Sequence, residues 1–241
     1  MAFLDHGDAR IHYEVSGNDN GFPVLTIAPG GMRSEIAMWS GKPWNPLEAL
    51  VDEYRLVAMD QRNAGSSTAP VGANDGWATY TDDQIAVLDH LGIESCHVVG
   101  MCIGGPYIAG LLQEAPERFV SAVMLQPVGV DGNREAFVEM FDGWAAEKAP
   151  EHPEADEATW ESFRSNMWDG DFVLTASRDE IATWETPLLV LMGDDQYHPQ
   201  STSREIARLA PNATLVERWK DDDVLADTDA TITSFLARYT P

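Results

Sequence analysis

The sequence predicts an α/β fold with a mostly parallel, twisted sheet of roughly eight strands and helices on both of its faces. Short, almost wholly apolar runs alternate with longer amphipathic stretches, which is typical of β-α units. At residues 96–105 an apolar run, a glycine-flanked turn and a helical stretch follow one another directly. The 241 residues are enough for a single domain, 1–241, with one sizeable core.

The expected strands are short, apolar and bounded by turn residues. They cover residues 9–15, 24–28, 54–59, 96–99, 121–125, 187–192 and 213–219. Helices are expected where apolar residues recur at helical spacing, which happens at residues 80–91, 104–115, 202–209 and 226–239. Gly92 follows the first of these helices and is suited to a C-cap.

The strand-helix alternation stops between Pro127 and Pro187, in a stretch rich in aromatic residues. We expect residues 128–184 to form a mainly helical cap insertion over the sheet. Its aromatic side chains either make a small core of their own or line an apolar substrate pocket, as such insertions do in many α/β enzymes. Trp144 and Trp168 are the candidates for substrate binding.

Acidic residues dominate the charge of this chain. The formal net charge is −25, the chain has 40 Asp and Glu against 15 Lys and Arg, and Lys42, Lys148 and Lys220 are its lysines. Binding of nucleic acid or of an anionic membrane surface is therefore not expected. The charge fits either a self-repelling acidic surface or an adaptation to high salt, which screens such repulsion.

The composition gives further expectations about location and ligands. The first residues lack the basic and apolar segments of a signal peptide, and no run is long enough to span a bilayer. Two cysteines make no disulfide framework and suit a reducing, cytoplasmic location. No cofactor or metal is expected, since His198 has no second ligand at metal-binding spacing. A small-molecule substrate is expected, and a homodimer remains an open alternative to a monomer.

Residues 100–104, Gly-Met-Cys-Ile-Gly, carry the chemistry of the sequence. A nucleophile on a strained strand-to-helix turn needs small residues two positions before and after it, and Gly100 and Gly104 supply them. The N-terminus of the following helix favours thiolate over thiol. Cys102 is therefore the candidate nucleophile, and the alternative is a buried structural cysteine in a turn without chemistry.

Four motifs occur in order, each after an expected strand: residues 28–32, 60–67, 100–104 and 193–199. Together they resemble the α/β-hydrolase fold superfamily, and the resemblance extends from about Ile11 to Tyr239. The sequence departs from the family pattern at Pro29, where a histidine is often found, at Asn63 and Ala64 in the second motif, and at Cys102, where serine is commoner. Such a resemblance implies the fold, and by itself no particular function.

The resemblance also implies an oxyanion hole, a set of backbone N–H groups that holds the developing negative charge. Its expected donors are the N–H of Ile103 and one from Gly31 or Met32. Asp60 is expected to brace its loop through Arg62 rather than to react.

The resemblance places the catalytic acid in residues 193–199. Asp195 is favoured over Asp194 because it stands four residues before Pro199, and the alternative is that both cap the following helix.

The general base is the open question. The family places a histidine after its last strand, where this chain has residues 217–223, Glu-Arg-Trp-Lys-Asp-Asp-Asp, and no histidine follows His198. His198 is either a displaced base that reaches Cys102 or a loop histidine that braces its own turn. Lys220 is a weaker substitute.

Three functions therefore stay open. The first is a hydrolase of a small ester, lactone or thioester that uses the Cys102 thiol and a backbone oxyanion hole. The second is an acyltransferase or lyase of the same fold, because an acyl-enzyme that lacks a base to activate water would persist. The third is a ligand-binding protein with a degraded triad.

Overall fold

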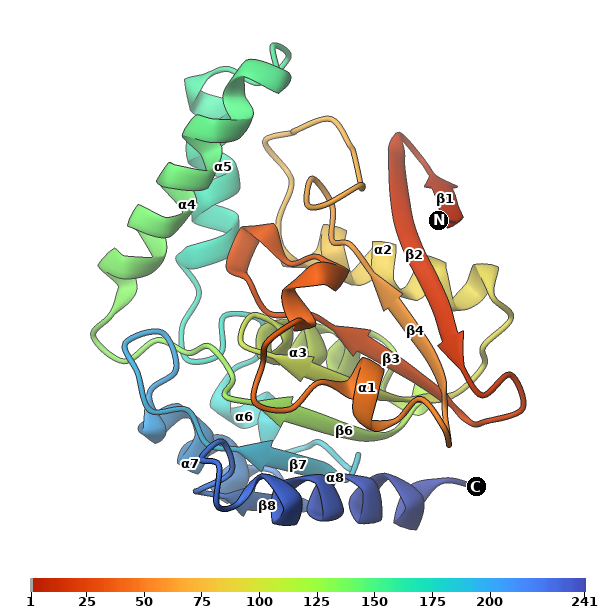
Figure 1. Cartoon of the computed structure of the whole chain (residues 1–241). Coiled ribbons are helices and arrows are strands. Elements are labelled where there is room, and N and C mark those ends of the chain that lie inside the picture. The colour runs from red at the N-terminus through yellow and green to blue at the C-terminus, as the bar shows by residue number, and fades with distance from the viewer. Residues whose placement is uncertain (1) are drawn as a thin grey trace.

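The computed structural model describes residues 2–241, in which eight strands form one sheet. Their spatial order is β1-β2-β4-β3-β5-β6-β7-β8 (Figure 1). The strands are β1 (Ala2–His6), β2 (Ala9–Gly17), β3 (Pro23–Ile27), β4 (Arg55–Met59), β5 (Cys96–Met101), β6 (Phe119–Leu125), β7 (Leu188–Leu191) and β8 (Ala213–Val216). The neighbouring strands from β4 through β3, β5, β6 and β7 to β8 pair in parallel. Strand β1 is antiparallel to β2, and β2 is antiparallel to β4. The predicted fold class is confirmed.

Strand β1 is the one strand whose position the sequence did not indicate. It runs antiparallel to β2, from Ala2 opposite Tyr13 to His6 opposite Ala9, and Gly7 turns the chain between them with a φ of 59°. Most of its residues are half-buried, so the alternation of apolar and polar residues that marks a strand is weak here. Pairing with β2 stabilises it instead.

The helices are α1 (Pro46–Ala49), α2 (Trp77–His90), α3 (Gly104–Glu114), α4 (Arg134–Lys148), α5 (Glu157–Trp168), α6 (Arg178–Ile181), α7 (Gln200–Leu209) and α8 (Leu225–Tyr239). Short 3₁₀ helices occur at η1 (Gly31–Arg33), η2 (Ile36–Trp39), η3 (Pro116–Arg118) and η4 (Ala149–Glu151).

The core has two parts because successive strand residues point to opposite faces of the sheet. Leu25 and Val98 pack on one face with residues of α2 and α3. Val24 and Val99, their direct neighbours in the chain, pack on the other face with Ile232 of α8. Helices therefore cover both faces.

The segment between β6 and β7 contains α4, α5 and α6. Helices α4 and α5 contact each other and extend away from the sheet (Figure 1), and α4 also contacts η1. Phe141, Trp144 and Phe163 pack ring against ring between α4 and α5. This segment thus has its own aromatic core and meets the sheet near the loop that follows β3.

Within residues 2–241, no helix combines the length and the apolar character needed to cross a membrane.

Candidate active site

Cys102 lies on a sharp turn between β5 and α3. Its φ of 62° is in the left-handed region, which non-glycine residues rarely adopt and which is costly to maintain. A Cβ on Gly100 would lie 3.0 Å from the Cα of Gly104, and one on Gly104 would lie 3.1 Å from the carbonyl oxygen of Ile27. Both glycines are therefore favoured, because a Cβ at either position would crowd the backbone.

Hydrogen bonds to the neighbouring strand hold this strained residue in place. The N–H of Cys102 donates to the carbonyl oxygen of Leu125 at 2.9 Å. Its own carbonyl oxygen accepts from Gly105 at 3.0 Å and from Val128 at 3.1 Å. The thiol is thus fixed at the carboxyl end of the parallel strands, where open α/β sheets bind their ligands.

The pKa of the Cys102 thiol is lowered from its ordinary value. Burial acts to raise it, but the neighbouring His198 outweighs burial, with help from the backbone N–H groups of Gly30 and Ile103. At Cys96, burial outweighs the lowering effects of Arg118 and of a backbone hydrogen bond with Leu25, and it raises the pKa of that thiol to about 12. Of the two thiols, Cys102 is therefore the one that ionises more readily.

His198 follows β7, in the loop that leads to α7. Its Nδ1 atom is 2.7 Å from Oδ1 of Asp195, and this oxygen also accepts the backbone N–H groups of Tyr197 at 2.9 Å and His198 at 3.1 Å. These bonds orient the ring and leave Nε2 as the nitrogen that can serve Cys102. They also lower the pKa of Asp195, against an opposing effect of burial.

The pKa of His198 is raised, because Cys102 and Asp195 outweigh the effect of burial. The Nε2 atom is buried and makes no hydrogen bond of standard geometry. Catalytic hydrogen bonds are often long or poorly aligned before substrate binds, so we treat Cys102 and His198 as a neighbouring ion pair rather than as an aligned hydrogen bond. The opposite pKa shifts of the two groups favour a thiolate beside an imidazolium.

Gly193 allows His198 to reach this position. A Cβ at residue 193 would lie 2.4 Å from both the Cβ and the carbonyl oxygen of His198, so no other residue type fits beneath the loop. The hydrogen bonds that Asp195 accepts from Tyr197 and His198 hold this loop in a tight turn. Gly193 was part of the motif found in the sequence, but its close approach to His198 is visible only in the structure.

The loop after β3 borders the nucleophile. Gly30 and Gly31 have φ values of 125° and 61°, and both line the cavity at Cys102 together with Ile103. Met32 is buried and is not among the lining residues. The N–H groups that act on the sulfur belong to Gly30 and Ile103, so Gly30 is a contributor that sequence reasoning did not single out.

A cavity of about 230 Å³ opens at Cys102 and His198. Apolar side chains and glycines make up most of its wall: Gly30, Gly31, Ile103, Val128, Phe137, Met140, Trp168 and Tyr197. Trp168 lies in the wall, stacked on Phe137 at 5.0 Å between ring centroids. Trp144 does not line the cavity and packs in the core between α4 and α5. The sequence left open whether the aromatic residues of this segment line a pocket or form a core, and Trp168 does the first and Trp144 the second.

Lys220 lies outside this cavity wall. Its ammonium group pairs with the carboxylate of Asp194 and is 3.2 Å from Oε1 of Gln126. The two adjacent aspartates therefore differ in their partners: Asp194 binds Lys220 and Asp195 binds His198.

Asp60 braces its loop, but the expected link through Arg62 is wrong. Asp60 accepts from Nδ1 of His12 at 2.7 Å and from the N–H groups of Ile36 and Ser66, each at 2.8 Å. Arg62 instead donates two bonds, at 2.8 and 2.9 Å, to Asp83 of α2. A buried guanidinium gains most from such a two-bond carboxylate partner, which Asp83 supplies with both its oxygens.

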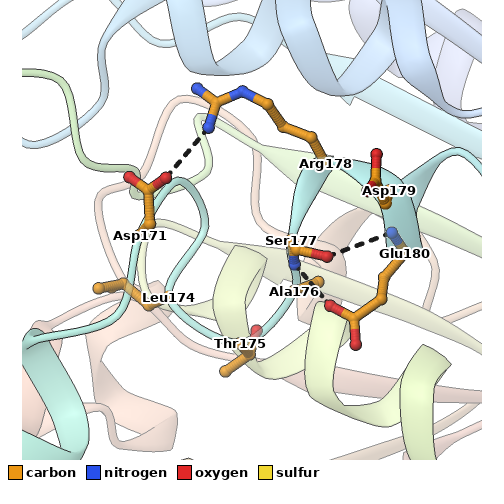
Figure 2. A pocket seen from close by; sticks show the side chains of 8 residues that line it. All are labelled: Asp171, Leu174, Thr175, Ala176, Ser177, Arg178, Asp179 and Glu180. Carbon is orange, nitrogen blue, oxygen red and sulfur yellow. Dashed lines mark hydrogen bonds and ion pairs between the residues drawn. The ribbon is translucent and has the colours of Figure 1, made fainter.

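A larger hollow of about 510 Å³ lies near α6 (Figure 2). Its polar groups already pair with one another: Arg178 with Asp171, and Ser177 with Glu180 through two hydrogen bonds (Figure 2). It contains no nucleophile with a base beside it, so the smaller cavity at Cys102 is the candidate active site. Within residues 2–241, no group of three His, Cys, Asp or Glu side chains is arranged to hold a metal ion.

The family model described as alpha/beta hydrolase fold matches residues 23–167. Because this match spans more than half of the chain, the protein belongs to the α/β-hydrolase fold family.

Two curated proteins illustrate the sequence relationship. A putative carbamate hydrolase of Variovorax paradoxus is 33% identical over 115 residues, which are 48% of this chain and 41% of the relative. A carboxylesterase of Bacillus subtilis is 30% identical over 129 residues, which are 54% of this chain and 40% of that protein. The matches thus span less than half the length of these relatives.

Solved structures share the fold over nearly the whole chain. The enol-lactonase from Burkholderia xenovorans LB400 has a TM-score of 0.71 at 18% identity, covering 98% of this chain and 100% of that one. A meta-cleavage product hydrolase from Pseudomonas fluorescens IP01 has a TM-score of 0.71 at 22% identity, covering 96% of both chains. At these identities the likeness concerns the fold alone.

Proposed function

We propose that this protein is a hydrolase that cleaves a small ester, lactone or thioester through the Cys102 thiolate. One observation carries the proposal: His198, oriented by Asp195, borders the same cavity as Cys102, and each shifts the pKa of the other toward its charged form. In this proposal Cys102 is the nucleophile and His198 is the base, and the sequence left open whether these two groups meet.

In the first half of the reaction, the sulfur of Cys102 attacks the carbonyl carbon of the substrate. The carbonyl oxygen becomes an oxyanion, which the N–H of Ile103 and N–H groups of the loop at Gly30, Gly31 and Met32 stabilise. When the intermediate collapses, the bond to the leaving group breaks and His198 gives that group its proton. The product is a thioester on Cys102 and a released alcohol or thiol.

In the second half, His198 takes a proton from water as the water oxygen attacks the thioester. The second oxyanion occupies the same donors and collapses to release the acid and the thiolate. Asp195 keeps Nδ1 protonated throughout, so Nε2 is the nitrogen that exchanges protons. A base oriented in this way favours transfer of the acyl group to water over its persistence on the enzyme.

The segment 128–184 belongs to this proposal as a cap. Phe137, Met140 and Trp168 come from this segment and border the cavity, so they would contact the substrate next to the thiol. The substrate is then held between the cap and the loop at Gly30 and Gly31, and the alpha/beta hydrolase relatives named above give the reaction class its second support.

The test is hydrolysis of p-nitrophenyl acetate and of a matching thioester at pH 7. Cys102→Ala is expected to abolish turnover, and Cys102→Ser to leave little of it, because a hydroxyl is far less acidic than a thiol and must lose its proton during the attack. Cys96→Ala is the matched control, since it removes the other thiol, which is buried away from the cavity. Full activity of Cys102→Ala would refute the proposal.

A further inference from the structure

The wall of the cavity at Cys102 carries no cationic group besides His198. Besides Cys102, its other members among the described residues are Gly30, Gly31 and Ile103, together with Val128, Phe137, Met140, Trp168 and Tyr197. No arginine or lysine lines it. A substrate carboxylate held there would lose its hydration without gaining an ion-pair partner, which is strongly unfavourable.

Charged side chains next to the cavity have partners within the protein. His198 lies between Cys102 and Asp195, and these two groups raise its pKa against the effect of burial. Arg33, at the end of η1, binds Glu147 of α4 at 2.6 Å, and Lys220 binds Asp194. Arg134 has no carboxylate partner, but it donates to the carbonyl oxygens of Trp168 and Gly170 and does not line the cavity. The chain as a whole has a net charge of −25, so its long-range field also opposes an approaching anion.

The size of the cavity limits the substrate as well. A volume of about 230 Å³ would hold roughly eight water molecules at about 30 Å³ each. This is below the range of pockets for drug-sized ligands, about 300 to 1,000 Å³. A short acyl group with a small leaving group fills such a space.

From this lining we propose that the site accepts small, uncharged acyl compounds and rejects those that carry a carboxylate. The inference rests on the proposed role of Cys102, and it adds the substrate class. Selectivity arises from the wall formed by the cap and the loop at Gly30, whereas reactivity arises from Cys102 and His198. The two can therefore be tested separately.

The first experiment compares two alkylating reagents that differ in charge, neutral iodoacetamide and anionic iodoacetate. With either reagent the sulfur of Cys102 attacks the CH₂ carbon, iodide leaves and a thioether forms, which peptide mass mapping locates. The ratio of the two rates is divided by the same ratio for N-acetylcysteine under the same conditions. We expect Cys102 to favour iodoacetamide by about 30-fold over the free thiol at low ionic strength.

Met140→Lys tests the cause of this preference. Met140 projects from α4 over Gly31, where its sulfur lies 3.0 Å from the place that a Cβ would occupy. A lysine there adds one positive charge to the wall, and we expect it to shift the ratio toward iodoacetate by about 10-fold. The matched control is Glu139→Gln, which makes the same change in net charge at the exposed neighbouring residue and is expected to leave the ratio unchanged.

A pair of esters gives the second experiment. p-Nitrophenyl butyrate and p-nitrophenyl hemisuccinate have acyl chains of similar length, and only the latter ends in a carboxylate. We expect kcat/KM to be lower for the hemisuccinate by about 30-fold or more, after correction for their uncatalysed hydrolysis.

The outcomes separate this inference from the proposed function. If Cys102 reacts readily with both reagents in the ratio of the free thiol, the charge selectivity is refuted and the thiol nucleophile stands. If neither reagent modifies Cys102 at pH 7, the activated thiol is refuted, and the inference that depends on it is refuted too. The wild-type ratio alone decides whether the site is selective for charge, so the inference stays testable even if Met140→Lys misfolds.

Discussion

Removal of the His198 imidazole is the most informative perturbation of this site. In the folded protein burial alone would raise the pKa of Cys102, and His198 is the first of the groups that bring it down. In His198→Ala the thiol keeps its buried surroundings and loses its counter-charge. We therefore expect the pKa of Cys102 to rise to the value of a free thiol, about 8.5, or above it.

Two rates should fall by different amounts. A thiol with a pKa of about 8.5 is only about 3% ionised at pH 7, whereas the pKa of the wild-type thiol is lowered by its neighbours. A thiolate of higher pKa is also more nucleophilic, which returns part of the loss, so alkylation by iodoacetamide at pH 7 should slow about three- to tenfold. Turnover should fall further, by about 10²–10⁴-fold, because both proton transfers also lose their base.

The assay is the pH dependence of iodoacetamide alkylation between pH 5 and 10, with thiolate absorbance as a second measure of ionisation. The midpoint for Cys102 should move to higher pH in His198→Ala, whereas His90→Ala, an exposed histidine at the end of α2, should leave it unchanged. An unchanged midpoint together with near-normal turnover would show that His198 only braces its own loop. Lys220 or solvent would then be the base.

Three further predictions follow from other contacts. Asp195→Asn should lower kcat by roughly 10- to 1,000-fold, because it removes the charge that orients His198 and stabilises its protonated form. Asp194→Asn should change kcat less than about threefold. Equal effects of the two substitutions would contradict the assignment of Asp195. Burial lowers the pKa of His97 to about 4, so this histidine stays neutral in the folded protein but gains a proton in the unfolded chain below about pH 6.5. The free energy of unfolding, measured in urea, should therefore fall by up to about 3 kcal/mol between pH 6.5 and 4. His97→Gln should lack this part of the pH dependence. Raising the KCl concentration from about 0.05 to 1 M should raise the Tm, because the Debye length falls to about 3 Å and the salt then screens the self-repulsion of a chain with net charge −25. An unchanged Tm would remove support for salt adaptation.

The strand-helix order and the turn at Cys102 were predictable because both depend on local chemistry. Continuous apolar runs can be buried only as central strands, and the spacing of Gly100 and Gly104 around Cys102 is a direct steric requirement of the turn. The position of strand β1 was not predictable in this way, because its half-buried residues lack a clear pattern and its stability comes from pairing with β2.

The sequence alone determined the class of fold and the turn that carries Cys102, because local sterics permit few alternatives there. It could not decide where His198, Trp144 and Trp168 lie relative to Cys102. Those positions depend on where separate segments meet. Asp195 holds the loop so that His198 borders the same cavity as Cys102, about a hundred residues away in the chain. The packing of α4 against α5 places Trp168 in the cavity wall and Trp144 in the aromatic core between these helices. Distances between segments are set by the closing of loops over the sheet and by helix packing, which no local pattern encodes, and so the tertiary structure alone decided them.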